Sequence, residues 1–143
     1  MNVSAILAEK GTSVFTLKSG IGIMDAVRSL RENKVGALIV SDDGQSIDGI
    51  LSERDIVRGI AELGAACLER NVADLMTRDV VTCSEDATVS DLMELMTQGR
   101  FRHLPVVRGN ALVGIVSIGD IVKRRIADVE REAEEIRSYI ATA

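Results

Sequence analysis

The stretch GILSERDIV at residues 49–57 returns almost unchanged as GIVSIGDIV at residues 114–122, with six of nine positions identical. The offset between the two copies is 65 residues here, and it is 66 residues upstream, where Val14 matches Val80 and Asp25 matches Asp91. The change falls in the polar loop 41–46, where turn chemistry tolerates an insertion. The match predicts an internal duplication.

Each copy predicts the same order of elements, β-α-β-β-α. The expected strands are residues 14–17, 37–41 and 47–52 in the first copy, and residues 80–83, 104–108 and 112–117 in the second. Apolar side chains at helical spacing predict the helices between them, at Ile23, Val27 and Leu30 and again at Val89, Met93 and Met96. The strands are apolar throughout, which indicates sheets covered on both faces.

Composition narrows the function classes. The chain has 143 residues, 46% of them apolar, with a net charge of −5 and three aromatic residues, Phe15, Phe101 and Tyr139. Scattered rings and an acidic balance argue against nucleic-acid binding. No apolar run approaches the ~20 residues of a membrane span, and no secretory signal is visible, so we expect a cytoplasmic protein. Cys67 and Cys83, with one histidine in the chain, predict reduced thiols and no metal site.

A heptad pattern follows the second copy. The apolar seam consists of Val122, Ile126, Val129, Ala133, Ile136 and Ile140. This spacing suits a helix that pairs with another helix across a homodimer, and it equally suits a helix that packs on its own domain. We expect the homodimer contact.

The duplicated motif places a Ser-x-x-Asp at the start of a helix in both copies, as Ser52 with Asp55 and Ser117 with Asp120. Serine at the N-cap and an acid three residues later form a capping box. A carboxylate where a strand meets a helix can also accept two hydrogen bonds from the vicinal diol of a ribose, and the free amides there favour an anionic ligand. The two roles are compatible.

Residues 3–126 resemble a tandem pair of CBS (cystathionine-β-synthase) domains, the Bateman module. The duplicated motif and the stretch RFRHLPVV at residues 100–107 carry the resemblance. It implies an α/β (α+β) fold of two β-α-β-β-α repeats packed by pseudo-two-fold symmetry, with a C-terminal helix added. The expected boundaries are 3–64 for the first repeat, 65–126 for the second and 127–143 for the helical tail. Modules of this family usually pair into disc-like dimers.

The resemblance also implies two clefts that bind adenosyl ligands, namely AMP, ADP, ATP, NAD(H) or S-adenosylmethionine. By position, the ribose acids match Asp55 and Asp120, and the phosphate-binding cations match Arg54, Arg102 and His103. The remaining expected ligand-binding residues are Ile21, Ala26, Val35, Gly36, Ala37, Ser52, Ile115 and Ser117. The second copy departs from the family's cationic pattern, because Gly119 stands where the first copy has Arg54.

The function implied is that of a stand-alone regulatory module, not an enzyme, that signals energy or redox state to a separate partner protein. The expected regulatory ligand is an adenine nucleotide, AMP first and NAD(H) or ATP next, because a sulfonium ligand would not need Arg54 and Arg102. No catalytic residue is expected, and no nucleic acid or membrane partner. The alternative is a dimerisation or scaffold module with no physiological ligand.

Overall fold

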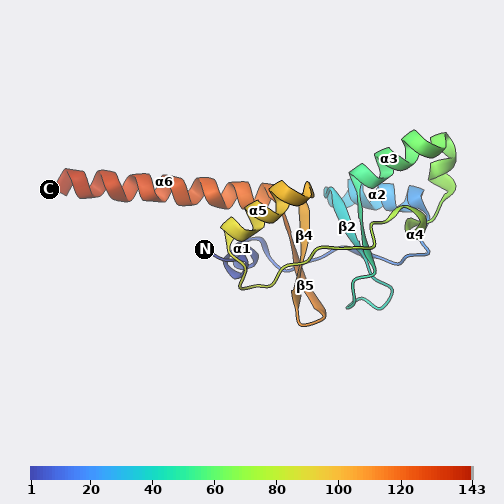
Figure 1. Cartoon of the computed structure of the whole chain (residues 1–143), viewed down its shortest axis with the longest axis horizontal. Helices are drawn as coiled ribbons and strands as arrows, with labels where there is room; N and C mark the ends of the chain where they lie inside the picture. Colours follow the sequence, from blue (N-terminus) through green and yellow to red (C-terminus); the bar gives the residue numbers. More distant parts are fainter. Residues whose placement is uncertain (143) are drawn as a thin grey trace.

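The computed structural model, which describes residues 1–142, shows two sheet-and-helix units side by side, and a long helix projects from one of them (Figure 1). The first unit contains β1 (Thr16–Leu17), α2 (Ile23–Asn33), β2 (Ala37–Val40), β3 (Gly49–Ser52) and α3 (Glu53–Leu63). Its sheet has the order β1-β2-β3, with β1 parallel to β2 and β3 antiparallel. The 3-10 helix η1 (Gly64–Glu69) follows α3 and packs against α3 and α2 of the same unit.

The second unit repeats this plan with α5 (Val89–Gly99), β4 (His103–Arg108), β5 (Ala111–Ser117) and α6 (Ile118–Thr142). Strands β4 and β5 pair antiparallel, with His103 opposite Ser117. The β-α-β-β-α order is therefore confirmed in the first unit, the second unit follows it without the first strand, and the C-terminal helix is confirmed.

The expected strand at residues 80–83 is wrong except for its last residue, since Cys83 alone forms a parallel bridge, to Val106 of β4. Cys83 accepts from the Val107 amide at 2.9 Å and donates to the Pro105 carbonyl at 3.0 Å. The next bond of such a ladder would need an amide hydrogen on Pro105, and proline has none. In the first unit the corresponding residue is Ile39, whose amide does donate to the Phe15 carbonyl at 3.3 Å.

Two short helices each pack against the unit that the other repeat forms. Helix α1 (Val3–Lys10) precedes the first repeat but docks on the second unit, where the Val3 amide donates to the Ala87 carbonyl at 2.9 Å. Helix α4 (Val72–Leu75) docks on the first unit in the same way, through the Val72 amide and the Ile21 carbonyl at 2.8 Å. The packing units therefore differ from the sequence repeats.

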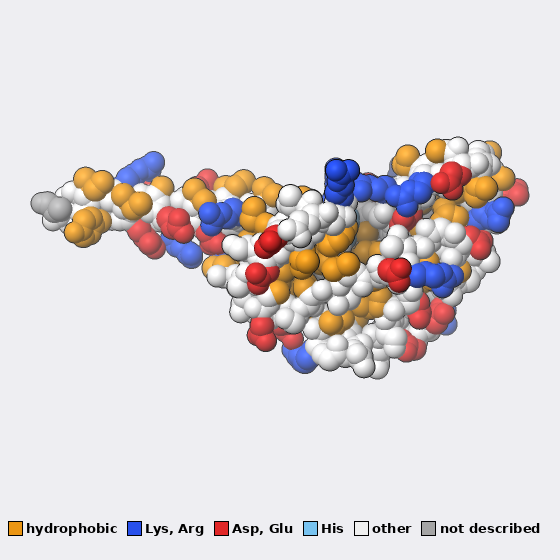
Figure 2. All heavy atoms as spheres, viewed as in Figure 1, with side chains coloured by type: hydrophobic (Ala, Val, Ile, Leu, Met, Phe, Trp, Pro, Cys, Tyr) orange, Lys and Arg blue, Asp and Glu red, His pale blue; other side chains and the backbone are white. Residues whose placement is uncertain are grey.

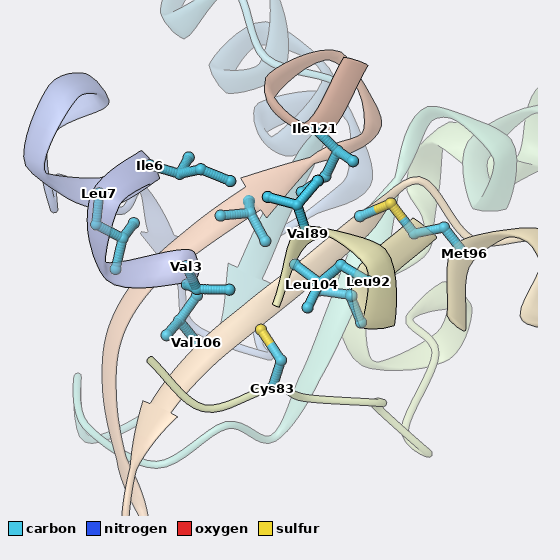
Figure 3. Close-up of a cluster of buried hydrophobic side chains, with 11 residues drawn as sticks. Val3, Ile6, Leu7, Cys83, Val89, Leu92, Met96, Leu104, Val106 and Ile121 are labelled. Carbon is cyan, nitrogen blue, oxygen red and sulfur yellow. The ribbon is translucent and has the colours of Figure 1, made fainter. Parts of the chain in front are cut away.

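The cores show the exchange directly. In the second unit, Val3, Ile6 and Leu7 of α1 lie against Leu104 and Val106 of β4 (Figure 3). Helix α5 contributes Val89, Leu92 and Met96 to the same cluster. Met93, which the helical spacing assigned to the apolar face, is instead 40% exposed, because Leu92 takes the buried position.

Helix α6 is one continuous helix with an unexpected inner face. Ile121 and Asp128 are its buried residues, and Arg124 between them holds Glu9 of α1 at 2.9 Å and Asp128 at 3.4 Å. The heptad seam faces outwards, from Val122 at 47% exposed to Ile140 at 68%. Within residues 1–142 this chain does not cover its own seam. No helix in that range combines the length and the apolar character that a membrane crossing needs.

Candidate functional site

The first cleft is built around Asp55, in the first turn of α3. The Asp55 carboxylate accepts from the Ser52 amide at 2.9 Å while the Ser52 hydroxyl accepts from the Asp55 amide at 3.3 Å, so the predicted capping box is confirmed. The second carboxylate oxygen, Oδ1, accepts from the Thr77 hydroxyl at 3.2 Å. Asp55 is thereby held in one orientation, with 6% of its surface exposed.

Basic side chains surround this acid. The cavity over Asp55 has a volume of about 620 Å³, within the range of small-molecule sites. Its basic lining comes from α3 and from the turn between α5 and β4, and consists of Arg54, Arg58, Arg100, Arg102 and His103. Figure 2 shows Lys and Arg side chains gathered along the upper edge between the two units, above a hollow.

The turn that supplies these cations has a fixed conformation. Arg100 ends α5 in the left-handed region, with φ of 56°, and its carbonyl accepts from the Arg54 guanidinium at 2.9 Å. This bond ties α3 of the first unit to α5 of the second. The rim of the Asp55 cleft is therefore assembled from both units.

The second predicted cleft is centred on Asp120, in the first turn of α6. Here too the capping box forms, with the Ser117 amide donating to Asp120 Oδ2 at 2.8 Å and the Asp120 amide donating to the Ser117 hydroxyl at 3.2 Å. A cation completes the arrangement, because Lys10 Nζ lies 2.6 Å from the same Oδ2. Burial alone would raise the Asp120 pKa, but the Lys10 ammonium and the Ser117 bonds together hold this pKa below its usual value.

His103 belongs to the Asp55 cavity and is also close enough to Asp120 for the charge of that acid to act on its pKa. It lines the Asp55 cavity, and a Cβ added to Gly36 would lie 3.3 Å from its ring. Burial lowers the pKa of His103, and the positive charge of Lys10 lowers it further, while Glu53 and Asp120 partly offset the shift. The imidazole therefore favours its neutral form at pH 7.

The structure gathers some of the predicted residues and separates others. Ser52, Arg54, Asp55, Arg102 and His103 all line the Asp55 cavity. Ser117 and Asp120 are hydrogen-bonded to each other across the strand end, and Ile115 lies two residues before Ser117 on β5.

The residues expected to form an adenine wall beside Asp120 are mostly occupied elsewhere. Ala26 belongs to the first hydrophobic core at 0% exposed, and Ile21 and Val35 pack against that core. Ala37 is buried in β2 opposite Ser52, and the His103 ring fills the space that a side chain at Gly36 would need.

Sequence reasoning missed Lys10 and Thr77, which contact the two ribose-type acids. Both residues lie in segments outside the matched motifs, just before the first expected strand of a repeat. Each contacts an acid far away in the sequence, 110 residues from Lys10 and 22 from Thr77. Only the exchange of α1 and α4 would have indicated these pairs.

Known proteins share this architecture. The family model described as "CBS domain" matches the chain twice, at residues 7–62 and 72–127. The crystal structure of the CBS-domain containing protein ATU1752 from Agrobacterium tumefaciens is 44% identical, with a TM-score of 0.85, and the match covers 87% of this chain and 99% of that one. The CBS domain pair of protein MJ0100, solved in complex with 5′-methylthioadenosine and S-adenosyl-L-methionine, is 27% identical with a TM-score of 0.79, over 90% of this chain and 98% of that one.

A curated relative adds a second comparison. The mitochondrial CBS domain-containing protein CBSX3 of Arabidopsis thaliana is 36% identical over 82% of this chain. The chain spans 59% of the length of that relative. Two family matches, the doubled Ser-x-x-Asp geometry and these neighbours agree, and the chain belongs to the CBS domain family as a tandem CBS pair.

Proposed function

We propose that this CBS pair is a regulatory module that binds adenine nucleotides in its clefts and passes the bound state to a partner protein. AMP is the ligand that we place first, with NAD(H) and ATP next. The proposal rests most directly on one observation. An oriented carboxylate, Asp55, lies at the base of a cavity whose rim carries four arginines.

The chemistry of the cavity suits a nucleoside phosphate. A ribose diol can donate to the Asp55 carboxylate, which capping already holds against Ser52. A phosphate attached to that ribose would meet Arg54, Arg100 or Arg102, because these cations line the same cavity. An arginine forms strong paired hydrogen bonds to phosphate oxygens, whereas a sulfonium group would be repelled. A related CBS pair was solved with two adenosyl ligands, which supports the ligand class.

Membership of the CBS domain family supports a regulatory role. The two family matches cover residues 7–62 and 72–127, and the residues around Asp55 form a binding surface in which a carboxylate faces a rim of arginines. A ligand that prefers one arrangement of the two units shifts the population towards it, and a partner with different affinities for the arrangements detects the shift. We place this function in the cytoplasm, where the free thiols Cys67 and Cys83 remain reduced.

A thermal-shift panel tests the proposal. The purified chain is heated with AMP, ADP, ATP, NAD⁺, NADH, S-adenosylmethionine and adenosine, each in large excess. A ligand at a hundredfold excess over its Kd adds ~2.7 kcal/mol to the free energy of unfolding. For a chain of this size the melting temperature then rises by roughly 5–10 °C. A panel without any shift contradicts the nucleotide function and leaves a dimerisation module.

The exposed seam of α6 supports a second proposal, that the chain forms a homodimer through this helix. The seam residues Ile136 and Ile140 are 60% and 68% exposed on the projecting part of the helix. An isolated helix of this length is marginal in water, so an apolar stripe on it needs a packing partner. A second copy offers an identical stripe.

Substitutions on the seam test the homodimer. Ile136→Glu and Ile140→Glu together place charge in the seam, and truncation after Arg125 removes most of it. Sedimentation velocity across a concentration series should show weaker association for both variants. Glu132→Gln, on a charged face of the same helix, is the matched control. If the truncated chain associates as tightly as the full chain, α6 is not the interface.

A further inference from the structure

The second cleft receives its cation from outside the repeat. Lys10 is the last residue of α1, and its ammonium lies 2.6 Å from Oδ2 of Asp120, the acid that we assign to the ribose. The same oxygen accepts from the Ser117 amide at 2.8 Å and from the Ser117 hydroxyl at 3.0 Å. Within residues 1–142, all side-chain hydrogen bonds to the Asp120 carboxylate converge on Oδ2, and Oδ1 is left for a further donor.

The position of Lys10 is set by the packing of α1. The Asn2 side chain caps the helix at 3.2 Å from the Ala5 amide, and Val3, Ile6 and Leu7 are buried in the second core. The residue before Lys10, Glu9, pairs with Arg124 of α6 at 2.9 Å. Lys10 is therefore delivered to Asp120 by an anchored element, and the side chains of Lys10 and Asp120 are 31% and 24% exposed.

The repeat explains why such a cation is needed. The Asp55 cleft obtains cations from Arg54, one residue before the acid, and from Arg102, and it also holds the imidazole of His103. The matching positions of the second cleft hold Gly119, Gly36 and Ala37, which carry no charge. Lys10 is the one cation in residues 1–142 that forms an ion pair with Asp120.

We propose that Lys10 is the phosphate-binding cation of the Asp120 cleft and makes this cleft select adenine nucleotides over uncharged adenosine. This inference rests on the proposed nucleotide function. A ribose diol competes with the ammonium for the Asp120 carboxylate. Adenosine offers the displaced ammonium no anionic partner, so the ion pair between Lys10 and Asp120 is lost without a replacement. A nucleotide carries a phosphate, so the Lys10 ammonium can leave the Asp120 carboxylate and pair with the phosphate instead.

The test compares two ligands on variants of one lysine. AMP and adenosine are titrated by calorimetry into the full chain carrying Asp55→Asn, which leaves the Asp120 cleft as the site measured. Lys10→Met should weaken AMP at least tenfold, since a hydrogen bond to a charged group contributes about 1.5–3 kcal/mol. The same substitution should leave adenosine binding unchanged or tighten it. Lys10→Arg should preserve the preference for AMP.

Lys18→Met is the matched control, because Lys18 is exposed, lies in the same N-terminal segment and removes the same charge. The proposal is overturned if Lys10→Met changes the affinities for AMP and adenosine by equal factors, or if Lys18→Met has the same effect. If the parent chain binds neither ligand, the nucleotide function itself fails.

An independent measurement guards against a folding artefact. Lys10 lowers the pKa of His103 through its charge, so Lys10→Met should raise this pKa in the ligand-free protein. The chain has a single histidine, and its imidazole resonances can be followed by NMR without assignment. A folded Lys10→Met variant with an unchanged His103 pKa places the ammonium elsewhere and contradicts the proposal.

Discussion

The two clefts start from the same nine-residue motif but end with different surroundings. Asp55 accepts from the Thr77 hydroxyl and lies 3.7 Å from the Arg58 guanidinium, within a rim of arginines, whereas the Lys10 ammonium lies 2.6 Å from Asp120. Both acids carry the same capping box with the preceding serine. The motif therefore sets the position of each carboxylate, and the exchanged segments around α1 and α4 set its electrostatic partner. A duplicated site can diverge in this way while the motif itself stays intact.

The largest expected effect comes from releasing α1, the element that distinguishes the second cleft. Ile6 is 4% exposed in the second core, so Ile6→Ala should lower the free energy of unfolding by about 2–5 kcal/mol. Urea denaturation measures this change. Ser4→Ala, at an exposed position of the same helix, should change it by less than about 0.5 kcal/mol. A loss at Ile6 as small as that at Ser4 would show that α1 is not anchored as described.

The two acids that we propose to bind ribose give the next largest effect. Asp55→Asn and Asp120→Asn each keep a capping side chain but lose the charged acceptor for a diol. Each should weaken adenosine binding at its own cleft at least tenfold, because charged hydrogen bonds contribute about 1.5–3 kcal/mol. Calorimetry with each single variant and the double variant measures the two losses separately. Unchanged affinity in both single variants would leave capping as the only role of these acids.

Arg102 tests whether the Asp55 cavity binds a phosphate. It lines the Asp55 cavity, and Arg102→Ala should weaken AMP several-fold more than adenosine, since only AMP offers a phosphate. The control is Arg31→Ala, an exposed arginine in the last turn of α2. Titration of both ligands into Arg102→Ala gives the answer. Equal losses for AMP and adenosine would assign Arg102 to packing.

His103 gives the smallest effect. Its pKa lies below the usual 6.5 because burial and Lys10 disfavour the imidazolium, against the pull of Glu53 and Asp120. Between the folded and the unfolded pKa the unfolded chain binds more protons, so stability rises with pH there. The contribution of His103 is complete above pH 6.5 and declines as the pH falls below it. Melting curves from pH 7.5 to 5.5 should show an acid-side decline that is reduced in His103→Gln. The same decline in both proteins would assign it to other groups.

The sequence predicted what is encoded locally. The repeated motif was sufficient for both capping boxes and for the start of α3 and α6, because these depend on residues three apart. The prediction of a strand at 80–83 was wrong because of Pro105 in the neighbouring strand, which has no amide hydrogen to continue the ladder. The Lys10–Asp120 pair could not be predicted, since it depends on α1 packing against the second unit and not the first.

Helix α6 begins beside the Asp120 cleft and extends without a break to Thr142, which makes it a lever. From Asp120 to that end it is about 33 Å long at 1.5 Å per residue. Two ion pairs from adjacent residues of α1, Lys10 with Asp120 and Glu9 with Arg124, hold the first turns of this helix. A tilt of about 5° at these turns would move the far end of α6 by about 3 Å, because of the length of the helix. A change at the Asp120 carboxylate that tilts α6 would therefore produce its largest displacement at the far end of the helix, which is remote from both clefts.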